Sequence, residues 1–382
     1  MNLIMTTLIL KFKSSQPYLL FFAVFSLSFS SVAATTTDGP GYGEYVKTYE
    51  ENFDILRDGT VELYNRHGKI HITHHDANEV DVKVRVVVQA RDQSAADRVF
   101  ERIGIDMSGS NSAVRVRTEI GTGRNNNWNN GDFKIIYDVR LPTTVGLKVD
   151  AKHCDLYVDD HDGQAELLVK YGDLHAESFR SSSFITVAYG NAEIDELGGN
   201  TRVNISYGEI DLDEAENLEL KIRYSEGQIT EVENLLLDSR YDEMEIGRAA
   251  NISIDAGYTD FEIGTVDNVR ARSNYSEYEF DEIRLNADIE TGYGDISIDR
   301  LASGFGEIKI RGNYSDVEMA PQSGSGYSFS GRASHGDVSV PDNLNINRRE
   351  KEGHSESIEG TIAGSGQGTI RISTTYGDID IR

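Results

Sequence analysis

Acidic side chains recur through the last two-thirds of this 382-residue chain, each two residues after an aromatic one. Seven of them are candidates for cation binding: Asp173, Glu209, Glu226, Glu243, Asp260, Glu277 and Asp295. If the segments that carry them stack as strands, the carboxylates form a column spaced by about 4.8 Å, where two unit charges repel by roughly 1 kcal/mol in water. Such a column can bind calcium or another divalent cation weakly, or it can be a solvated row of turn residues screened by salt. The sequence indicates no other cofactor.

The aromatic residues of the same segments are the second candidate surface. Five of them follow one another at intervals of 17 residues: Tyr207, Tyr224, Tyr241, Tyr258 and Tyr275. Stacked aromatic rings can bind a sugar or the apolar face of a partner, and they can also stabilise a stack without any ligand. Trp128, in an asparagine-rich loop, is a third candidate for interaction, although its ring can equally fold back onto the core.

Catalytic chemistry finds little support in the sequence. It shows no Ser-His-Asp signature, no phosphate-binding glycine loop and no Cys-x-x-Cys pair. A solenoid enzyme that cleaves polysaccharide also uses carboxylates, but its acid and base need distinct surroundings, and here every unit repeats the same acid. We keep that enzyme as the alternative. His71, His74, His75 and Asp76 could supply metal ligands, yet adjacent side chains of a strand point to opposite faces.

An internal repeat organises these residues. Each unit reads aromatic, small or polar, acid, then apolar-x-apolar, and copies start from Tyr171 at intervals of 17 to 21 residues until His335. The next copy, at Tyr376, follows after 41 residues, which we interpret as one decayed unit in between. Apolar residues lie 3, 5, 8, 11 and 13 positions after the tyrosine, so spacings of two indicate strands and spacings of three indicate corners. Each unit is therefore predicted to be one coil of a parallel β-solenoid with two short strands, rather than one of a stack of antiparallel hairpins.

Two further features fit such a coil. Asparagines recur ten residues after the tyrosine, at Asn217, Asn234, Asn251 and Asn268, which predicts a ladder of side-chain amides. The only cysteine, Cys154, lies where other units have glycine, so we expect it to replace that turn glycine. A single cysteine cannot form an internal disulfide, and the stability of the chain must come from packing.

The chain divides into four predicted segments. Residues 1–34 carry Lys11 and Lys13 before an apolar run and end on small residues, as a secretory signal peptide does. Residues 35–52 lack apolar periodicity and are expected to be a linker. Residues 53–150 are expected to form a small β-rich domain, with strands at 60–64, 69–72, 80–88, 113–120 and 133–141. Its one helix is predicted at Ser94–Ile103, capped by Ser94 and stopped by Gly104, and residues 151–382 are the solenoid.

The charge of the chain limits its partners. A formal net charge of −27 disfavours nucleic acid and anionic lipid, because binding to either relies on Lys and Arg. After residue 34 no segment is apolar enough to span a bilayer, so we expect no transmembrane segment in the mature chain.

Several motifs together resemble a known family. They are the strand, helix, strand lead-in over 82–120, the Tyr137-Asp-Val-Arg-Leu-Pro142 element, the repeated Tyr-Gly-Asp or Tyr-Gly-Glu turns and the closing stretch 370–379. Over roughly residues 53–382 the sequence is similar to the bacterial family of suspected adhesins, exported β-strand-repeat proteins described as a domain of unknown function. The resemblance implies an envelope-associated, non-enzymatic protein and carries no catalytic residue.

We therefore expect an exported, all-β protein: a parallel β-solenoid of 17–21-residue coils preceded by a small β-rich domain with one helix. It should act without catalysis, as an adhesin-like or scaffolding interaction protein of the bacterial cell envelope, in the periplasm or at the cell surface. Its partner is expected to be an envelope or surface protein or polysaccharide. The tyrosine and acidic columns would be its interaction face.

Overall fold

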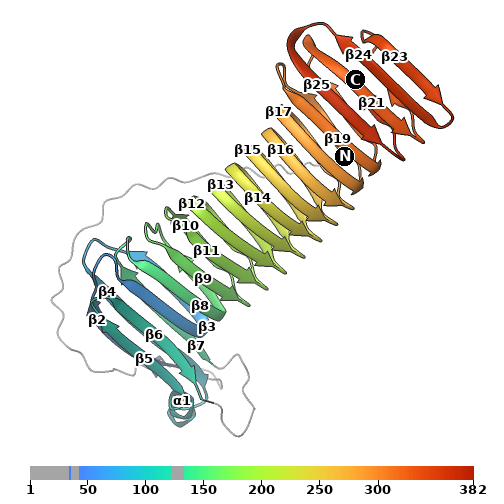
Figure 1. The fold of residues 1–382 in the computed structure, drawn as a ribbon. Helices are drawn as coiled ribbons and strands as arrows, with labels where there is room; N and C mark the ends of the chain where they lie inside the picture. Colours follow the sequence, from blue (N-terminus) through green and yellow to red (C-terminus); the bar gives the residue numbers. More distant parts are fainter. Residues whose placement is uncertain (1–33, 36–42, 122–132) are drawn as a thin grey trace, which may run out of the picture.

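The computed structural model describes residues 34–35, 43–121 and 133–382 of the chain. These residues form one continuous sheet that winds into a parallel β-solenoid, with a β-rich region and a helix at the N-terminal end (Figure 1). The predicted fold class is confirmed. The predicted signal peptide lies outside the described residues except for Ala34.

The N-terminal region leads directly into the coils. Its elements are β1 (Ala34–Thr35), β2 (Gly43–Asp54), β3 (Thr60–His74), β4 (Glu79–Ala90), α1 (Gln93–Phe100), β5 (Ile103–Ser110), β6 (Ala113–Ile120), β7 (Phe133–Leu141) and β8 (Gly146–Val158). Strand β4 pairs antiparallel with β2 and β7, whereas β3 pairs in parallel with β6, β7 and β8. Strand β3 is thus the first layer of the solenoid, although four strands and a helix separate it from β8 in sequence. The predicted boundary between the N-terminal domain and the solenoid, at residue 150, falls inside β8, so the sheet continues across it.

The expected linker is only partly a linker. Residues 43–52 belong to β2, which pairs with β4 along its whole length, from Gly43 opposite Ala90 to Asp54 opposite Glu79. Most side chains of β2 are only part-buried or exposed. The strand therefore lacks the apolar alternation by which a half-buried strand is detected in a sequence.

The helix is shorter than predicted and has a different cap. The side chain of Asp92 accepts a hydrogen bond from the backbone N–H of Ala95 at 2.8 Å, so Asp92 and not Ser94 is the N-cap. The helix ends at Phe100 because Ile103 and Gly104 already belong to β5, where Ile103 pairs with Ile120. Phe100 is buried, as its place on the apolar face predicts.

The central coils follow the repeat of the sequence. Their strands are β9 (Ala165–Lys170), β10 (Leu174–Phe179), β11 (Ser183–Ala188), β12 (Ala192–Ser206), β13 (Glu209–Arg223), β14 (Glu226–Arg240), β15 (Glu243–Gly257), β16 (Asp260–Asn274) and β17 (Tyr278–Tyr293). Each position pairs in parallel with its copy one unit later, as Ile229 does with Ile246 and Ile246 with Ile263. The two predicted strands per coil are separate in β10 and β11, but β12 to β17 each run through the corner as one bent strand.

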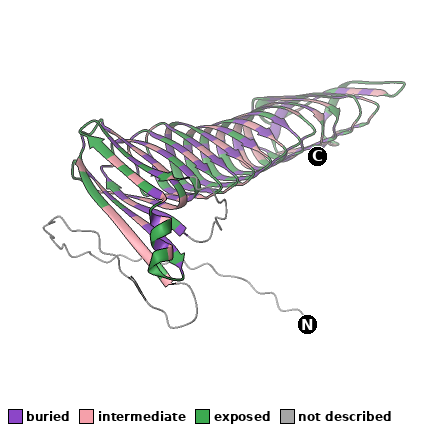
Figure 2. Cartoon of the chain, turned by 90° about the horizontal axis from the view of Figure 1, so that it is seen from below, coloured by how far each residue is buried: buried purple, intermediate pink, exposed green. Residues whose placement is uncertain are grey.

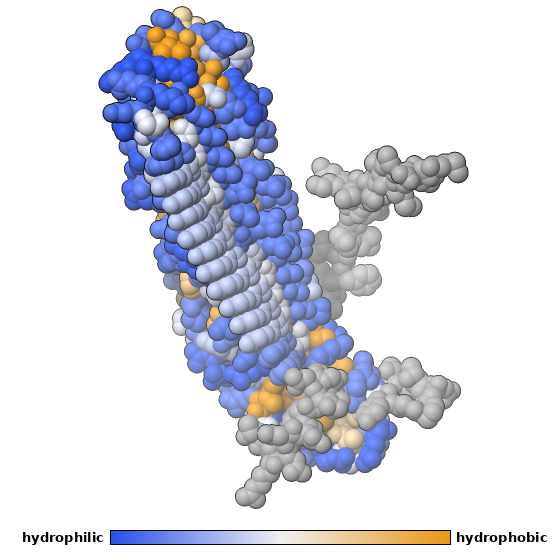
Figure 3. Space-filling model, turned by 90° about the vertical axis from the view of Figure 1, so that its right-hand side faces the viewer, coloured by the Kyte–Doolittle hydropathy of each residue, from blue (hydrophilic) through white to orange (hydrophobic). Residues whose placement is uncertain are grey.

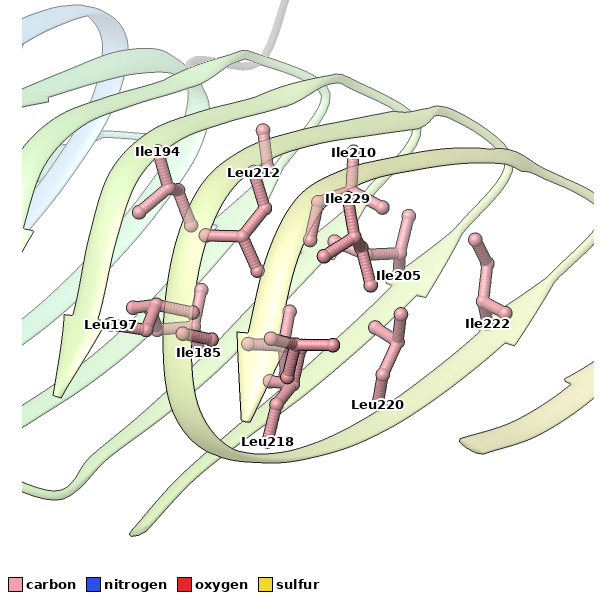
Figure 4. Packing of buried hydrophobic residues seen from close by; sticks show 14 of the residues in the cluster. Ile185, Ile194, Leu197, Ile205, Ile210, Leu212, Leu218, Leu220, Ile222 and Ile229 are labelled. Carbon is pink, nitrogen blue, oxygen red and sulfur yellow. The ribbon is translucent and has the colours of Figure 1, made fainter. Parts of the chain in front are cut away.

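The interior of the solenoid is a narrow apolar layer between the two sides of each coil. In β15 the predicted inward residues Met244, Ile246, Ala249, Ile252 and Ile254 are all buried. Buried and exposed residues alternate along the strands (Figure 2). The same arrangement in the neighbouring coils brings Leu212, Leu220 and Ile222 into the layer (Figure 4).

The C-terminal end departs from the order of the sequence. Its strands are β18 (Ile296–Leu301), β19 (Glu307–Tyr314), β20 (Val317–Pro321), β21 (Ser325–Ser334), β22 (Val338–Ser339), β23 (Asn345–Glu352), β24 (Ser355–Ile362), β25 (Ser365–Thr374) and β26 (Ile379–Ile381). Strand β25 pairs in parallel with both β19 and β21, and β26 pairs with both β20 and β22. The last coil of the chain is therefore inserted between two earlier coils.

This insertion corrects the interpretation of the 41-residue interval. The residues between His335 and Tyr376 hold no decayed coil, because β23 and β24 form an antiparallel hairpin that pairs with β21. Tyr376 stacks between Tyr314 and His335 instead of beyond His335. The hairpin supplies the extra length that the chain needs to return to the inserted position (Figure 1).

Candidate interaction surface

The aromatic residues at the coil turns form one unbroken stack, which we call the tyrosine ladder. In spatial order its members are His67, His153, Tyr171, Tyr189, Tyr207, Tyr224, Tyr241, Tyr258, Tyr275, Tyr293, Tyr314, Tyr376, His335 and His354. Centroids of neighbouring tyrosine rings lie 4.5–5.2 Å apart. Figure 3 shows the ladder as a pale column of stacked rings that runs along one face of the solenoid.

An unusual backbone conformation places the rings outward. The tyrosines from Tyr171 to Tyr275 have φ values between 51° and 61°, the left-handed region that costs an L-residue about 1–2 kcal/mol. The sharp turn brings the next residue against the neighbouring layer, where a Cβ on Gly190 would lie 2.0 Å from the carbonyl oxygen of Gly172. Sequence reasoning missed this conformation, since glycine and not the aromatic residue is the usual carrier of positive φ. Cys154 occupies the corresponding turn position after His153, as predicted.

The ladder offers ring edges and hydroxyl groups rather than ring faces. Tyr224 and Tyr241 are 52% and 50% exposed. Yet each ring is covered on both faces by neighbouring rings, whose centroids lie 4.8–5.2 Å away. A sugar ring cannot stack on a face that another ring already covers. The surface is therefore suited to partners that hydrogen-bond to phenol hydroxyls or contact ring edges.

The acidic column divides into two kinds of residue. At the first kind the carboxylate or amide oxygen accepts a hydrogen bond from the backbone N–H at the same position of the next layer. These residues are Asp155, Asp173, Asn191, Asp295, Asp316 and Asp378. Two of the predicted cation ligands, Asp173 and Asp295, are thus used to join layers.

The second kind lies in the central coils, where a backbone carbonyl takes over that role. The N–H of Glu226 donates to the carbonyl of Gly208, that of Glu243 to Ser225 and that of Asp260 to Asp242. A groove of about 510 Å³ lies beside these turns and is lined by Glu209, Glu226, Glu243 and Asp260 together with Tyr224 and Tyr241. We call it the acidic groove. Of the seven predicted cation candidates, the structure brings four together in it.

Electrostatics differ on the two sides of the tyrosine ladder. Just before the tyrosines, Arg223 pairs with Asp238 at 2.7 Å and Arg240 pairs with Asp255 at 2.5 Å, so these charges are neutralised within the protein. On the other side the carboxylates stand beside one another. Burial, followed by the charges of Asp260 and Asp295, raises the pKa of Glu277 above its usual range, as expected where carboxylates crowd. The acidic side is therefore the one that attracts cationic groups.

A second groove follows the predicted asparagine ladder. The amide of Asn234 donates to Asn217, that of Asn251 to Asn234 and that of Asn268 to Asn251, at 2.9–3.0 Å. Asn286 continues the ladder one coil beyond the predicted set, and its amide donates to Asn268 at 2.9 Å. It was not predicted, because one extra residue in β17 shifts it out of the strict 17-residue period. The groove has a volume of about 930 Å³. Its amides are largely used by one another.

The remaining predicted residues are not brought together. Trp128 lies outside the described residues. His71 hydrogen-bonds Asp138, whereas His74 lies 3.1 Å from His161 on the adjoining layer and His75 approaches Asp81. The expected divergence of these histidines along the strand is thus observed.

Comparison with known proteins identifies the family. The model of the Toastrack DUF4097 family matches residues 56–382. The chain belongs to the Toastrack DUF4097 family. No curated protein matches it.

Solved structures of other bacterial proteins are similar to this chain at low identity. A candidate cell adhesion protein from Clostridium sporogenes is 13% identical, with a TM-score of 0.18, and the match covers 88% of this chain and 99% of that one. A candidate adhesin from Bacteroides fragilis is 10% identical, with a TM-score of 0.22 and coverage of 88% and 97%. A candidate lipid-binding protein from Parabacteroides distasonis is 9% identical, with a TM-score of 0.21 and coverage of 88% and 96%. Similarity at this level carries no argument about function.

Among the residues that the structure describes, no helix is long and apolar enough to cross a membrane.

Proposed function

We propose that this protein is an exported, non-enzymatic interaction protein of the bacterial cell envelope, adhesin-like in action, that binds a cationic protein segment. The observation that carries the proposal is the juxtaposition of the half-exposed ladder tyrosines Tyr224 and Tyr241 with the carboxylates of the acidic groove. An Arg- or Lys-rich segment laid along the solenoid would donate hydrogen bonds to both rows. The net charge of −27 would accelerate its approach.

The setting of the groove residues supports binding rather than catalysis. Glu226 and Glu243 occupy equivalent positions of paired strands, so each carboxylate has the same kind of surroundings. A general acid and base need pKa values that their environments push apart. The groups whose pKa values are most strongly raised, such as Tyr137 and Tyr278, are buried in the core and not in the groove. A polysaccharide-cleaving enzyme stays the alternative.

The binding proposal can be tested on the whole chain with defined peptides. We would measure affinity by isothermal titration for an Arg- and Lys-rich peptide, an uncharged peptide of equal length and a neutral glycan. The variant E226Q/E243Q/D260N removes three charges from the acidic groove without changing side-chain size. We expect it to weaken binding of the cationic peptide at least tenfold, with steep loss of affinity as salt increases.

A matched variant separates the groove from overall charge. E214Q/E231Q/E233Q makes the same charge change at a distinct corner of the central coils, on β13 and β14, and we expect it to leave the affinity within about twofold. Equal weakening by the two variants would show that only net charge matters, and would overturn the proposal. Tighter binding of the neutral glycan would redirect it to polysaccharide.

A weak divalent cation in the acidic column stays a prediction. We propose that calcium, if it binds there, raises the melting temperature at fixed ionic strength, because a ligand of the folded state stabilises it. The E226Q/E243Q/D260N variant should then lose the rise. Identical melting in calcium and in ionically matched sodium chloride would leave the column as a solvated face.

A further inference from the structure

Three side chains at the turn between β3 and β4 approach one another closely. One ligand atom each from His75, Glu79 and Asp81 lies within 4.8 Å of the other two, the only such group of three metal-binding side chains among the described residues. Glu79 and Asp81 are two apart on β4 and therefore face the same side of the sheet. His75 lies in the preceding turn. Strands β3 and β4 belong to the N-terminal β-rich region, at the opposite end of the early coils from β14 to β16, which carry most of the acidic groove (Figure 1).

The imidazole of His75 lacks the partners that a covered polar group requires. Both of its ring nitrogens are shielded from solvent and have no hydrogen-bond partner in the structure. A neutral imidazole carries one N–H and one acceptor nitrogen, and leaving either without a partner is costly. The nearest carboxylate oxygen, Oδ2 of Asp81, is 3.8 Å from Nε2.

That separation is the one that a metal ion would bridge. It is too long for a hydrogen bond. It is shorter than about 4.2 Å, the sum of one zinc–nitrogen and one zinc–oxygen bond, so an ion can contact both atoms with only small side-chain rotations. One imidazole and two carboxylates form a ligand set that suits zinc and related first-row divalent ions.

The backbone around these residues is held by pairing, and the arginine that now contacts Asp81 can move. The backbone N–H of His75 donates to the carbonyl of Leu141 at 3.2 Å, and β4 is paired on both sides. Arg140 contacts Asp81 at 2.5 Å through Nη2, but its side chain is 63% exposed and can swing into solvent. A divalent ion bound in its place would neutralise both carboxylates.

We propose that His75, Glu79 and Asp81 form a binding site for a first-row divalent transition metal, with zinc as the ion that fits best. The site is independent of the proposed interaction function. It would tie the β3–β4 turn to the start of β4, and so brace the edge where the solenoid begins.

The test uses the whole chain after treatment with chelator and dialysis. Titration with zinc should show one tight site per chain and a rise in melting temperature. Cobalt, used as a spectroscopic substitute, should give visible absorption bands that change when an imidazole ligand is lost. H75Q should weaken zinc binding more than about 100-fold, since loss of even an outer-shell partner costs about 10–100-fold.

Matched variants make the result decisive. H71Q removes a histidine from β3, the strand just before the turn, one that contacts Asp138 instead, and should leave zinc binding unchanged. E79Q should weaken binding as H75Q does, and far-ultraviolet circular dichroism should show each variant folded. If H75Q and E79Q bind zinc like the parent, or if the loss follows E226Q/E243Q/D260N instead, the site is not where we place it and the proposal fails.

Discussion

The central coils and the C-terminal end are built from the same unit, yet they stack by different rules. From β12 to β17 each coil lies on the coil that precedes it in sequence, and equivalent residues such as Asn234 and Asn251 meet. At the C-terminal end, β25 and β26 lie between coils that come before them. The repeat therefore determines the shape of a coil, and the connections determine its place in the stack.

The N-terminal end shows the same independence. Strand β3 lies against β8, although β4 to β7 come between them in sequence. Both ends of the solenoid are thus closed by segments that return from elsewhere in the chain. A repeat array needs such atypical ends, because a plain terminal coil would expose an unpaired strand edge.

Removing the inserted coil should have the largest effect. Deletion of residues 363–382 takes away Ile370, Ile372, Ile379 and Ile381, which are buried between two layers. At about 1.5–3 kcal/mol for each buried side chain, the loss exceeds what a terminal segment can tolerate. We expect β21 to β24 to lose protection in hydrogen exchange while β12 to β16 stay protected. If β21 simply moves onto β19 and the end remains protected, insertion is not what holds it.

A charge in the central core should come next. Ile246 is fully buried between Ile229 and Ile263, so I246D would bury an unpaired carboxylate at a cost of roughly 4 kcal/mol or more. Its neighbour Glu245 points to solvent, and E245D should change stability by less than about 0.5 kcal/mol. Urea unfolding of the two variants would measure the difference. Similar shifts would contradict the observed inward face.

Acid should weaken the N-terminal end more than the centre. Burial, followed by the nearby His74, lowers the pKa of His161 to about 4, against about 6.5 for a free imidazole. As the pH falls from 6.5 towards 4 the unfolded chain takes up the proton first, so stability that is fully present above pH 6.5 declines by at most about 3 kcal/mol. In H161F this part of the pH dependence should disappear, as urea unfolding between pH 7 and 4.5 would show. An unchanged slope would exclude His161 as its source.

A break in the asparagine ladder should cost less. Asn251 donates to Asn234 and accepts from Asn268, so N251A removes two hydrogen bonds, worth about 1–2 kcal/mol together. N251D retains the acceptor for Asn268 and should lose roughly half as much. If N251A is as stable as the parent in urea, the ladder does not stabilise the coils.

Much of the central solenoid could be predicted from the sequence because its rules are local. The inward residues of β15 and the ladder from Asn217 to Asn268 follow directly from the 17-residue period. The position of Tyr376 between Tyr314 and His335 could not be predicted. Its place in the sequence is equally consistent with a coil that lies beyond His335. Only the pairing of β25 with both neighbours distinguishes the two.

The two columns of the candidate surface were predicted from the repeat, and their role in binding stays a prediction. The columns of tyrosines and acids were apparent, but their division was not, because Asp173 and Glu243 occupy the same position of the unit. They differ in what accepts the hydrogen bond from the backbone N–H of the next layer. At Asp173 the side chain accepts it, whereas beside Glu243 the backbone carbonyl of Asp242 accepts it. His75 was among the metal ligands considered, but its grouping with Glu79 and Asp81 was missed, because a turn separates the histidine from the carboxylates and no periodic signal links them.

The smallest effect should come from removing a whole central coil. Deletion of Tyr241 to Gly257 joins Arg240 to Tyr258 and brings Ile229 against Ile263, so every inward position keeps an equivalent neighbour. Circular dichroism and resistance to proteolysis should be nearly unchanged. Removal of residues 243–250 alone should unfold the adjoining coils, because inward side chains lose their register.

Deletion of one whole repeat unit at the C-terminal end should not be tolerated. Removing residues 314–334 also takes out one whole unit, but it deletes β20 and β21, which pair with β26 and β25. The inserted coil would keep β19 beside β25 and β22 beside β26, but each of its two strands would lose its other partner, and proteolysis should digest the end beyond β19. If this deletion is as well tolerated as that of Tyr241 to Gly257, the order of coils would follow the repeat alone, and the difference between the two regions would not hold.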